Sequence, residues 1–439
     1  MRDLPPSFVT ASAVKSISGA ALWRARACGS SSDSSPTGRR SAPLVTQPVR
    51  LVAALVFCNT FALGAFPVLL PDIAQQTGYD DVALGVLAGA FGFARLLCDL
   101  PAGLLLSRYL RAAILLGAAA LTSGNLLLFS GSELWMLVLG RGLYGAGHAT
   151  LLLSVLITVS RFAATSGHAF SLNVVEFSGM LGMLLGMLLV AVLPDGWPWQ
   201  RALMLASAPQ LVGLFLLPAL LRVVGSGEPV PSATPLECAG DRPADTPRWH
   251  ELISLNRLTM LAWVSGFVLA VAWAAVGQFI LPLRAAREFD LSRIGVAMML
   301  ALPQVVDLCF LLPLGRLADR VSRARLLGVI LLVLSVGIAA MAFGSFAWAV
   351  FGCALFGIGL AAWMLPISLL GRPSSPRAAA LRVSLHRTFV DAGVFFGPLC
   401  AGLLAEAGLL WVAGIASAAG LLVVGAALLV HDHRSGSVS

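Results

Sequence analysis

Long apolar runs separated by short polar segments are the feature that most limits what this chain can fold into. A helix that crosses the hydrocarbon core of a bilayer needs about 20 apolar residues. Runs of this kind lie at roughly 51–70, 82–106, 112–130, 134–158, 169–193, 202–221, 258–282, 291–314, 325–343, 345–370, 379–405 and 409–430. We therefore predict an all-α membrane protein with about twelve transmembrane helices in two groups of six.

Composition supports the membrane assignment. Only 11% of the residues are charged, whereas soluble domains carry about 25%, and the mean hydropathy is +0.89. The net charge of +8 does not indicate a nucleic-acid partner, because the basic residues are spread between apolar runs and form no patch. The lipid bilayer is the expected partner, and we expect a monomer.

The polar stretch 222–257, rich in Pro, Gly, Ser and charge, divides the two groups of helices. We expect a cytoplasmic, disordered tail at 1–50 and an N-terminal six-helix bundle at 51–221. A cytoplasmic linker at 222–257 should lead to a C-terminal six-helix bundle at 258–430 and a short cytoplasmic tail at 431–439. The first segment is rich in Ser and Arg, so an organellar transit peptide or an over-extended start are its alternatives.

The placement of arginine predicts the orientation, because cytoplasmic loops of membrane proteins carry an excess of Lys and Arg. The linker, both tails and the loops after the even-numbered helices are basic, whereas most other loops hold no Lys or Arg. The exception is the loop with Arg284, Arg287 and Arg293. Both termini are thus predicted to lie in the cytoplasm, with the bacterial plasma membrane as the expected location.

Signatures of enzyme chemistry are missing from the sequence. The seven cysteines are scattered without a C-x-x-C or a metal spacing, and there is no P-loop. No nucleophile–base pattern suggests an active site. We expect no catalytic residues, no cofactor and no metal.

Two related segments follow equivalent helices of the two groups, "PAGLLLSR" at 101–108 and "PLGRLADR" at 313–320. The first and seventh helices end alike as well, in "VLLP" and "FILP". Parallel six-helix repeats of this kind are a known transporter design, with the substrate site between them near the midplane.

The sequence resembles the major facilitator superfamily over roughly residues 50–430. "GRLADRVSR" is similar to the loop signature G-x-x-x-D-R-x-x-R, and "RGLYGAG" to the fourth-helix pattern R-x-x-x-G-x-G. "GMLLG" and "GVFFGP" resemble the fifth- and eleventh-helix glycine motif. The resemblance implies a secondary transporter that moves a small organic solute by alternating access. Proton-coupled efflux is the first interpretation, although the fifth-helix motif lacks the G-P of many antiporters. Proton-coupled uptake, or a non-transporting receptor or enzyme with the same fold, are the alternatives.

The loop segments predict a cytoplasmic gate. Its residues are Gly103, Arg108, Gly315, Asp319, Arg320 and Arg323. The two glycines are expected to permit close helix approach. The resemblance implies that Asp319 meets the start of the fifth helix and holds the cytoplasmic side shut. The alternative is an ordinary turn whose arginines only keep the loop in the cytoplasm.

Ionisable residues inside transmembrane helices are costly and therefore candidates for function. The predicted coupling network comprises Arg95, Asp99, Arg141, Glu176, Asp307, Arg387 and Asp391. Two i, i+4 pairs, "RLLCD" and "RTFVD", each place Arg and Asp on one helix face. The resemblance implies that helix two faces helix eleven and helix five faces helix eight.

These charges allow two interpretations. They form a structural salt-bridge network, or Glu176 and Asp307 share a proton while Arg95 and Arg387 compete for whichever acid is charged. Arg141 is either a coupling residue or a cap on backbone carbonyls. The resemblance further implies a substrate cavity lined by helices one, seven and ten, although each residue has a packing role as its alternative. The cavity candidates, including a histidine of helix four, are Asn59, Phe61, His148, Trp273, Gln278 and Trp363.

Overall fold

The computed structural model describes residues 47–162, 168–226, 256–370 and 376–436. All of them belong to one unit, residues 45–439. These residues form helices and no strands, and twelve of their segments are long and apolar enough to cross a membrane. The predicted all-α architecture with twelve spans is confirmed. The tail and most of the linker lie outside the described residues.

Five helices form the first half. They are α1 (Gln47–Thr77), α2 (Asp81–Ser130), α3 (Leu134–Phe162), α4 (His168–Ala191) and α5 (Trp199–Ser226). Helix α2 holds the second and third spans, and it breaks at Tyr109, where φ is −133° and ψ is 54°. Local chemistry sets the helix starts. The Asp80 side chain, for example, accepts a 2.7 Å hydrogen bond from the Ala83 amide and caps α2.

The second half contains the other six spans. Its elements are α7 (Arg257–Val271), the π-helix η1 (Ala272–Ile280), α8 (Leu281–Arg287), α9 (Arg293–Ala318), α10 (Arg323–Phe343), α11 (Phe346–Leu360), α12 (Leu365–Ser368), α13 (Pro376–Glu406) and α14 (Leu410–Gly436). The seventh span runs without interruption through α7, η1 and α8, and the tenth comprises α11 and α12.

Several helices extend beyond the predicted apolar runs. Helix α1 begins at Gln47, α5 continues to Ser226 and α14 to Gly436. These extensions are polar, so hydropathy alone placed them in the tails and the linker. A helix satisfies its own backbone groups, and it can therefore continue past the apolar segment into the polar interface.

Close helix contacts repeat between the halves. In the first half, Gly182 and Gly186 of α4 lie against the backbone of α1. In the second half, Gly393 and Gly397 of α13 lie against α7 and η1, and a Cβ at Gly393 would come 2.6 Å from the Phe267 carbonyl oxygen. The glycine motifs therefore pack equivalent helix pairs, as the internal repeat requires.

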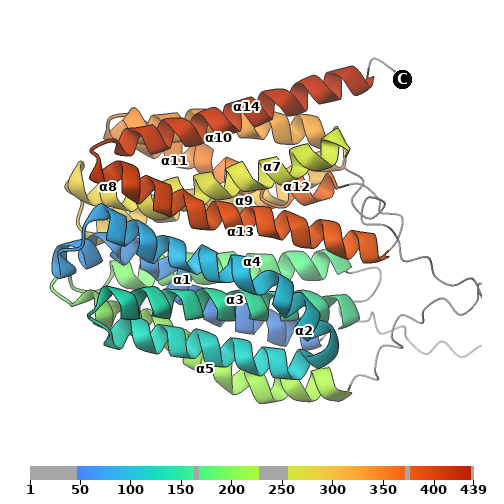
Figure 1. Cartoon of the computed structure of the whole chain (residues 1–439), viewed down its shortest axis with the longest axis horizontal. Helices are drawn as coiled ribbons and strands as arrows, with labels where there is room; N and C mark the ends of the chain where they lie inside the picture. Colours follow the sequence, from blue (N-terminus) through green and yellow to red (C-terminus); the bar gives the residue numbers. More distant parts are fainter. Residues whose placement is uncertain (1–46, 163–167, 227–255, 371–375, 437–439) are drawn as a thin grey trace, which may run out of the picture. The chain divides into compact units, whose positions relative to one another are not determined.

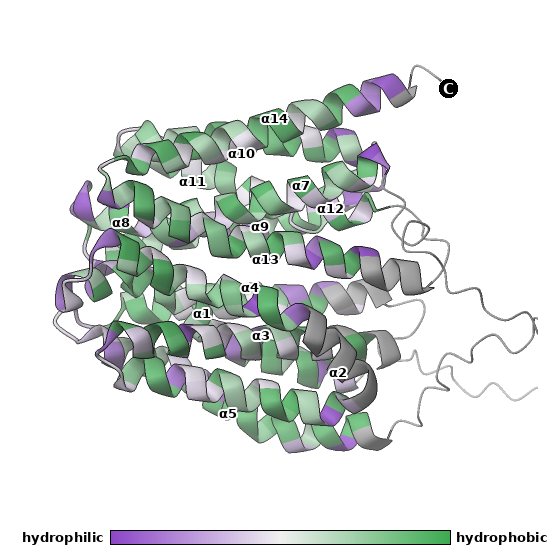
Figure 2. Ribbon diagram, viewed as in Figure 1, coloured by the Kyte–Doolittle hydropathy of each residue, from purple (hydrophilic) through white to green (hydrophobic). Residues whose placement is uncertain are grey.

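The halves meet along two helix pairs, α2 with α13 and α4 with α9, as the resemblance implied. Figure 1 shows the early helices grouped together in blue and green and the late helices in yellow to red, with α13 next to the first group. Figure 2 shows hydrophobic colour along the helices and hydrophilic colour gathered toward their ends.

We call the end of the bundle that holds the loops at 78–80, 131–133, 192–198 and 288–292 the outer end, and the opposite end the inner end. These names follow the orientation predicted from the arginines. At the outer end, α2 and α13 are in backbone contact, and a Cβ on Gly402 would lie 2.9 Å from the Gly85 Cα. The outer parts of the two halves are therefore packed closely together.

Candidate functional site: the interface between the halves

Four charged residues link α2 and α13 in two reciprocal ion pairs. Arg95 lies 2.7 Å from an Asp391 carboxylate oxygen, and Arg387 lies 3.1 Å from Asp99. The two helices run in opposite directions, since α2 begins and α13 ends at the outer end. An Arg followed four residues later by an Asp on each helix then places every Arg opposite the Asp of its partner. We call these four residues the quartet.

The quartet is buried in the middle of the interface. The Asp391 side chain is fully buried, the Asp99 side chain is 5% exposed, and each arginine side chain is 14% exposed. Arg95 lies 14 residues after Asp81, which is about 21 Å along a helix. Buried pairs gain little net stability, but loss of one partner is strongly destabilising because it leaves an unpaired charge.

The predicted acid pair lies between α4 and α9, the other two helices that join the halves. Asp307 is 1% exposed, one of its carboxylate oxygens has no hydrogen-bond partner, and it lies close enough to Glu176 for their charges to interact. The competition of Arg95 and Arg387 for these acids is not seen, because both arginines are bound to the aspartates of the quartet.

Arg141 forms no ion pair within the predicted network, although Arg95 also lies beside the Phe91 ring, with its guanidinium carbon 5.2 Å from the ring centre. It is 4% exposed, and its guanidinium carbon lies 3.8 Å from the Phe66 ring centre and 4.9 Å from that of Phe91. No hydrogen bond or ion pair joins it to any residue of the described ranges. Of the two alternatives for Arg141, the carbonyl cap is not seen in this structure, since aromatic rings surround the guanidinium.

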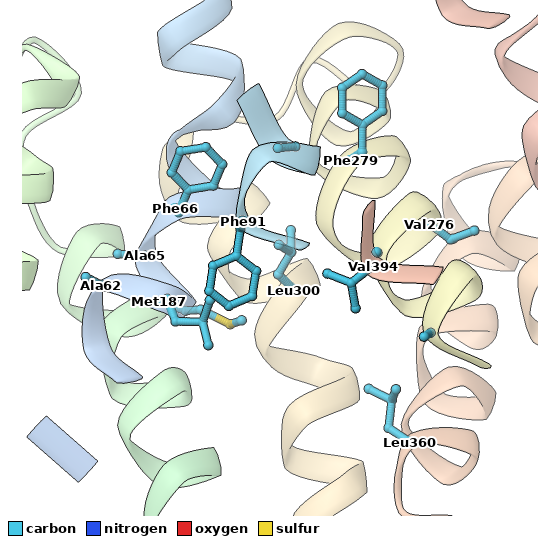
Figure 3. Packing of buried hydrophobic residues seen from close by; sticks show 14 of the residues in the cluster. Ala62, Ala65, Phe66, Phe91, Met187, Val276, Phe279, Leu300, Leu360 and Val394 are labelled. Carbon is cyan, nitrogen blue, oxygen red and sulfur yellow. The ribbon is translucent and has the colours of Figure 1, made fainter. Parts of the chain in front are cut away.

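A small pocket opens in front of Arg141, between the two halves. It is lined by Phe66, Ala88, Phe91, Arg141, Trp273, Ala274, Gln278, Val394 and Pro398. Figure 3 shows Phe66 and Phe91 on one side of this region and Val394 on the other. The free space is about 10 Å³, roughly enough for one water molecule. We call it the central pocket.

The cavity candidates divide into two groups. Trp273 and Gln278 line the central pocket, and Trp363 contacts Trp273 with ring centres 6.0 Å apart. His148 lies beside the Phe91 ring at 5.6 Å.

Asn59 and Phe61 do not line the central pocket. The Asn59 carbonyl accepts a hydrogen bond from Tyr144, and its side chain faces α5. The Phe61 carbonyl lies against Gly186. These two positions therefore pack the first half instead of contacting a solute here. The pocket residues that the sequence did not single out are mostly apolar, and such residues carry no signal that distinguishes them from lipid-facing ones.

The outer end is closed by ion pairs that sequence reasoning missed. Arg293 of α9 lies 2.7 Å from Asp72 of α1 and donates to the carbonyl oxygens of Pro194 and Trp197, both at 3.0 Å. Arg287 lies 2.8 Å from Asp81, and the Asp81 amide donates to Glu406 at 3.2 Å. We call these contacts the outer lock.

The signal for the outer lock was present in the sequence. Arg284, Arg287 and Arg293 are the arginines that broke the loop rule. Arg287 and Arg293 join the two halves, whereas Arg284 stays within the second half, where it donates to the Met341 and Gly344 carbonyls at the end of α10.

The predicted cytoplasmic gate is not assembled in the residues that can be described. Asp319, Arg320 and Arg323 are exposed, and Asp319 forms no ion pair with a described residue. A Cβ on Gly315 would meet nothing within 4 Å, so this glycine does not bring helices together here. The expected partner segment at 163–167 lies outside the described residues, and so do the surroundings of Gly103 and the side chain of Arg108.

Comparisons with known proteins agree with this architecture. The chain is similar in structure to the nucleoside transporter NupG, with 14% identity, a TM-score of 0.65, and coverage of 88% of this chain and 99% of that one. It is also similar to a bacterial homologue of the human lysosomal transporter Spinster in an inward-facing and occupied conformation, with 15% identity, a TM-score of 0.68, and coverage of 88% and 96%. It is similar as well to the E. coli fucose:proton symporter FucP, with 16% identity, a TM-score of 0.60, and coverage of 87% of this chain and 97% of that one. No curated protein sequence matches the chain.

A family model described as Major Facilitator Superfamily matches residues 52–283 and 258–438, which together span both halves. The motifs, the twelve spans and the paired six-helix halves agree with that match. The chain is an integral, multi-pass membrane protein, and it belongs to the Major Facilitator Superfamily of secondary transporters.

Proposed function

We propose that this protein moves a small organic solute by alternating access and couples that movement to protons. One observation carries the proposal: the central pocket, the quartet and the acid pair all lie in the interface between two repeated halves. Relative motion of the halves would change all three together. The favoured direction is efflux, with uptake as the alternative.

The order of the contacts along α2 and α13 supports a gating role for the ion pairs. Along α2, Asp81 of the outer lock is followed by Ala88 and Phe91 of the central pocket and then by Arg95 of the quartet. Helix α13 passes the same layers in the reverse order. The pocket therefore lies between two layers of ion pairs, and rocking of the halves would break one layer while the other holds.

Protons are assigned to the acid pair instead of the quartet. The quartet aspartates each have an arginine, whereas Glu176 and Asp307 have no ion pair with any described residue. Two carboxylates whose charges interact across the interface disfavour double ionisation. A single proton shared by this pair would be released when the halves separate and water reaches α4 and α9.

The test is solute flux in proteoliposomes across a solute library, with and without a pH gradient. Glu176→Gln and Asp307→Asn should abolish gradient-driven flux while exchange of solute persists. Glu133→Gln, at an exposed acid of the outer end, is the matched control and should behave as wild type.

The direction of the gradient that drives accumulation separates efflux from uptake. Normal gradient-driven flux in both acid variants would refute the coupling role. Binding of a solute without any flux in the wild type would instead support a receptor with this fold.

A further inference from the structure

Arg141 is a buried cation that has no counterion among the described residues. Its residue exposure is 4%, and its Nε has no hydrogen-bond partner. The aspartates of the quartet are occupied by Arg95 and Arg387. The Tyr144 ring centre lies 5.8 Å from the Arg141 guanidinium carbon, but the Tyr144 hydroxyl donates to the Asn59 carbonyl at 2.7 Å.

An unpaired charge buried in this way lowers the stability of the fold unless another group compensates for it. Burial of an unpaired ion is strongly unfavourable, and an arginine side chain cannot escape by losing its proton. Stacking on Phe66 and Phe91 offsets only a part of that cost, because a cation–π contact is much weaker than the lost hydration of a buried ion. An anion that binds beside this guanidinium would therefore supply the missing counterion.

The geometry directs the guanidinium toward a ligand. With Phe66 against its face, the N–H groups at its edge stay available in one plane, which suits the two oxygens of a carboxylate. Arg141 lines the central pocket together with residues of both halves.

The opposite wall is built from η1, which supplies Trp273 and Gln278. π-Helical turns are rare and occur frequently at functional sites. This wall therefore offers an amide for a polar group and an indole for an apolar body, with Trp363 behind the indole.

We infer that the central pocket binds an organic anion whose carboxylate pairs with Arg141 and whose apolar body lies against Trp273, which Trp363 supports from behind. This inference rests on the proposed transport function, because it names the class of solute for the same site. A single guanidinium matches a single negative charge, so a monocarboxylate is preferred to a phosphate ester. The pocket is nearly filled in this structure, and the halves must part to admit the ligand.

Binding to the purified protein in detergent, without any gradient, tests the inference. The probes are benzoate, 3-phenylpropionate, indole-3-acetate and octanoate, and the affinity of each is compared with that of its uncharged primary amide. Phenyl phosphate tests whether a phosphate ester binds instead. At least one acid should bind about tenfold tighter than its amide, a difference of about 1.4 kcal/mol. Arg141→Gln should remove that preference, Arg141→Lys should keep part of it, and Arg201→Gln, at an exposed arginine of the outer end, should leave it unchanged.

The outcomes are separable. The inference is wrong if no acid binds better than its amide, if phenyl phosphate binds tightest, or if folded Arg141→Gln keeps the preference. Should Arg141→Gln fail to fold, the wild-type pairs and Arg141→Lys still decide. Flux of neutral solutes without any acid preference would reject this inference and leave transport standing, whereas acid binding without flux would reject transport and leave the anion site.

Discussion

At the scale of single residues, charges of the same kind experience different surroundings in this interface. Arg95 and Arg387 each meet an aspartate of the opposite half, while Arg141 meets aromatic rings. The consequence of losing a partner therefore differs from one residue to the next. Removal of Asp391 would strand a buried arginine, whereas removal of Arg141 would strand no acid of the described chain.

We predict that Asp391→Asn destabilises the protein by about 3 kcal/mol, the lower end for breaking one side of a buried pair. Adding Arg95→Gln should restore most of that loss, because the stranded cation is then removed. Thermal unfolding in detergent measures both effects, and Asp290→Asn, at an exposed acid with φ of 50° that asparagine tolerates, is the control. Equal stability of Asp391→Asn and the control would contradict the assignment of a tight buried pair.

At the scale of elements, the outer parts of the helices hold the two halves together. Arg293 at the start of α9 reaches α1 and the segment that follows α4, and Arg287 at the end of α8 reaches the start of α2. Between these contacts, glycines let α2 and α13 approach. At Gly89, for example, a Cβ would lie 3.0 Å from the Phe395 carbonyl oxygen.

Loss of Arg293 should open the outer end. Truncating one partner of a buried charge pair typically costs 2–5 kcal/mol, and about 1.4 kcal/mol corresponds to a tenfold shift. In a background without the native cysteines, Ala88→Cys in the central pocket should react with an impermeant maleimide at least about tenfold faster in Arg293→Gln. Arg201→Gln is the matched control at an exposed outer arginine, and an unchanged labelling rate in Arg293→Gln would argue against the outer lock.

A bulky residue at Gly402 should also open the outer end, but by steric overlap instead of the loss of an ion pair. The added side chain of Gly402→Val would overlap the backbone of Gly85 and force α2 and α13 apart. We expect faster labelling of Ala88→Cys here as well. Gly196→Val, where a Cβ would meet nothing within 4 Å, should leave the rate unchanged. Slower labelling in Gly402→Val would mean that this contact does not close the pocket.

At the scale of the whole molecule, the halves are repeats with contacts of opposite kinds at their two ends. Every ion pair that joins the halves within the described ranges lies at the outer end or in the middle. At the inner end, Gly315 and Asp319 contact no residue of the other half that can be described. The described contacts between the halves are therefore concentrated at the outer end and in the middle.

The orientation of the bundle yields a separate prediction. Cysteines placed at Gln75 and Ser132 should react with impermeant reagents from outside the cell, because both positions lie at the outer end and are exposed. A cysteine at Ser232 in the linker should react only after the membrane is permeabilised. Reaction of the linker position in intact cells would overturn the orientation inferred from the arginines.

The sequence by itself determined the class of fold and the helix pattern. A membrane-spanning helix satisfies its backbone within one segment, so hydropathy along the chain is sufficient to find it. The i, i+4 spacing likewise placed Arg95 and Asp99 on one face, because that relation is local.

Only the tertiary structure decided which charge meets which. Arg95 and Asp391 are 296 positions apart, and their contact depends on the rotation and direction of two helices, which no local pattern records. The same holds for Arg293, whose place in an outer loop looked like an exception to a rule until Asp72 and the nearby carbonyls were found beside it. The lack of a partner for Arg141 is also a property of the packed interface, since it depends on everything that surrounds the guanidinium.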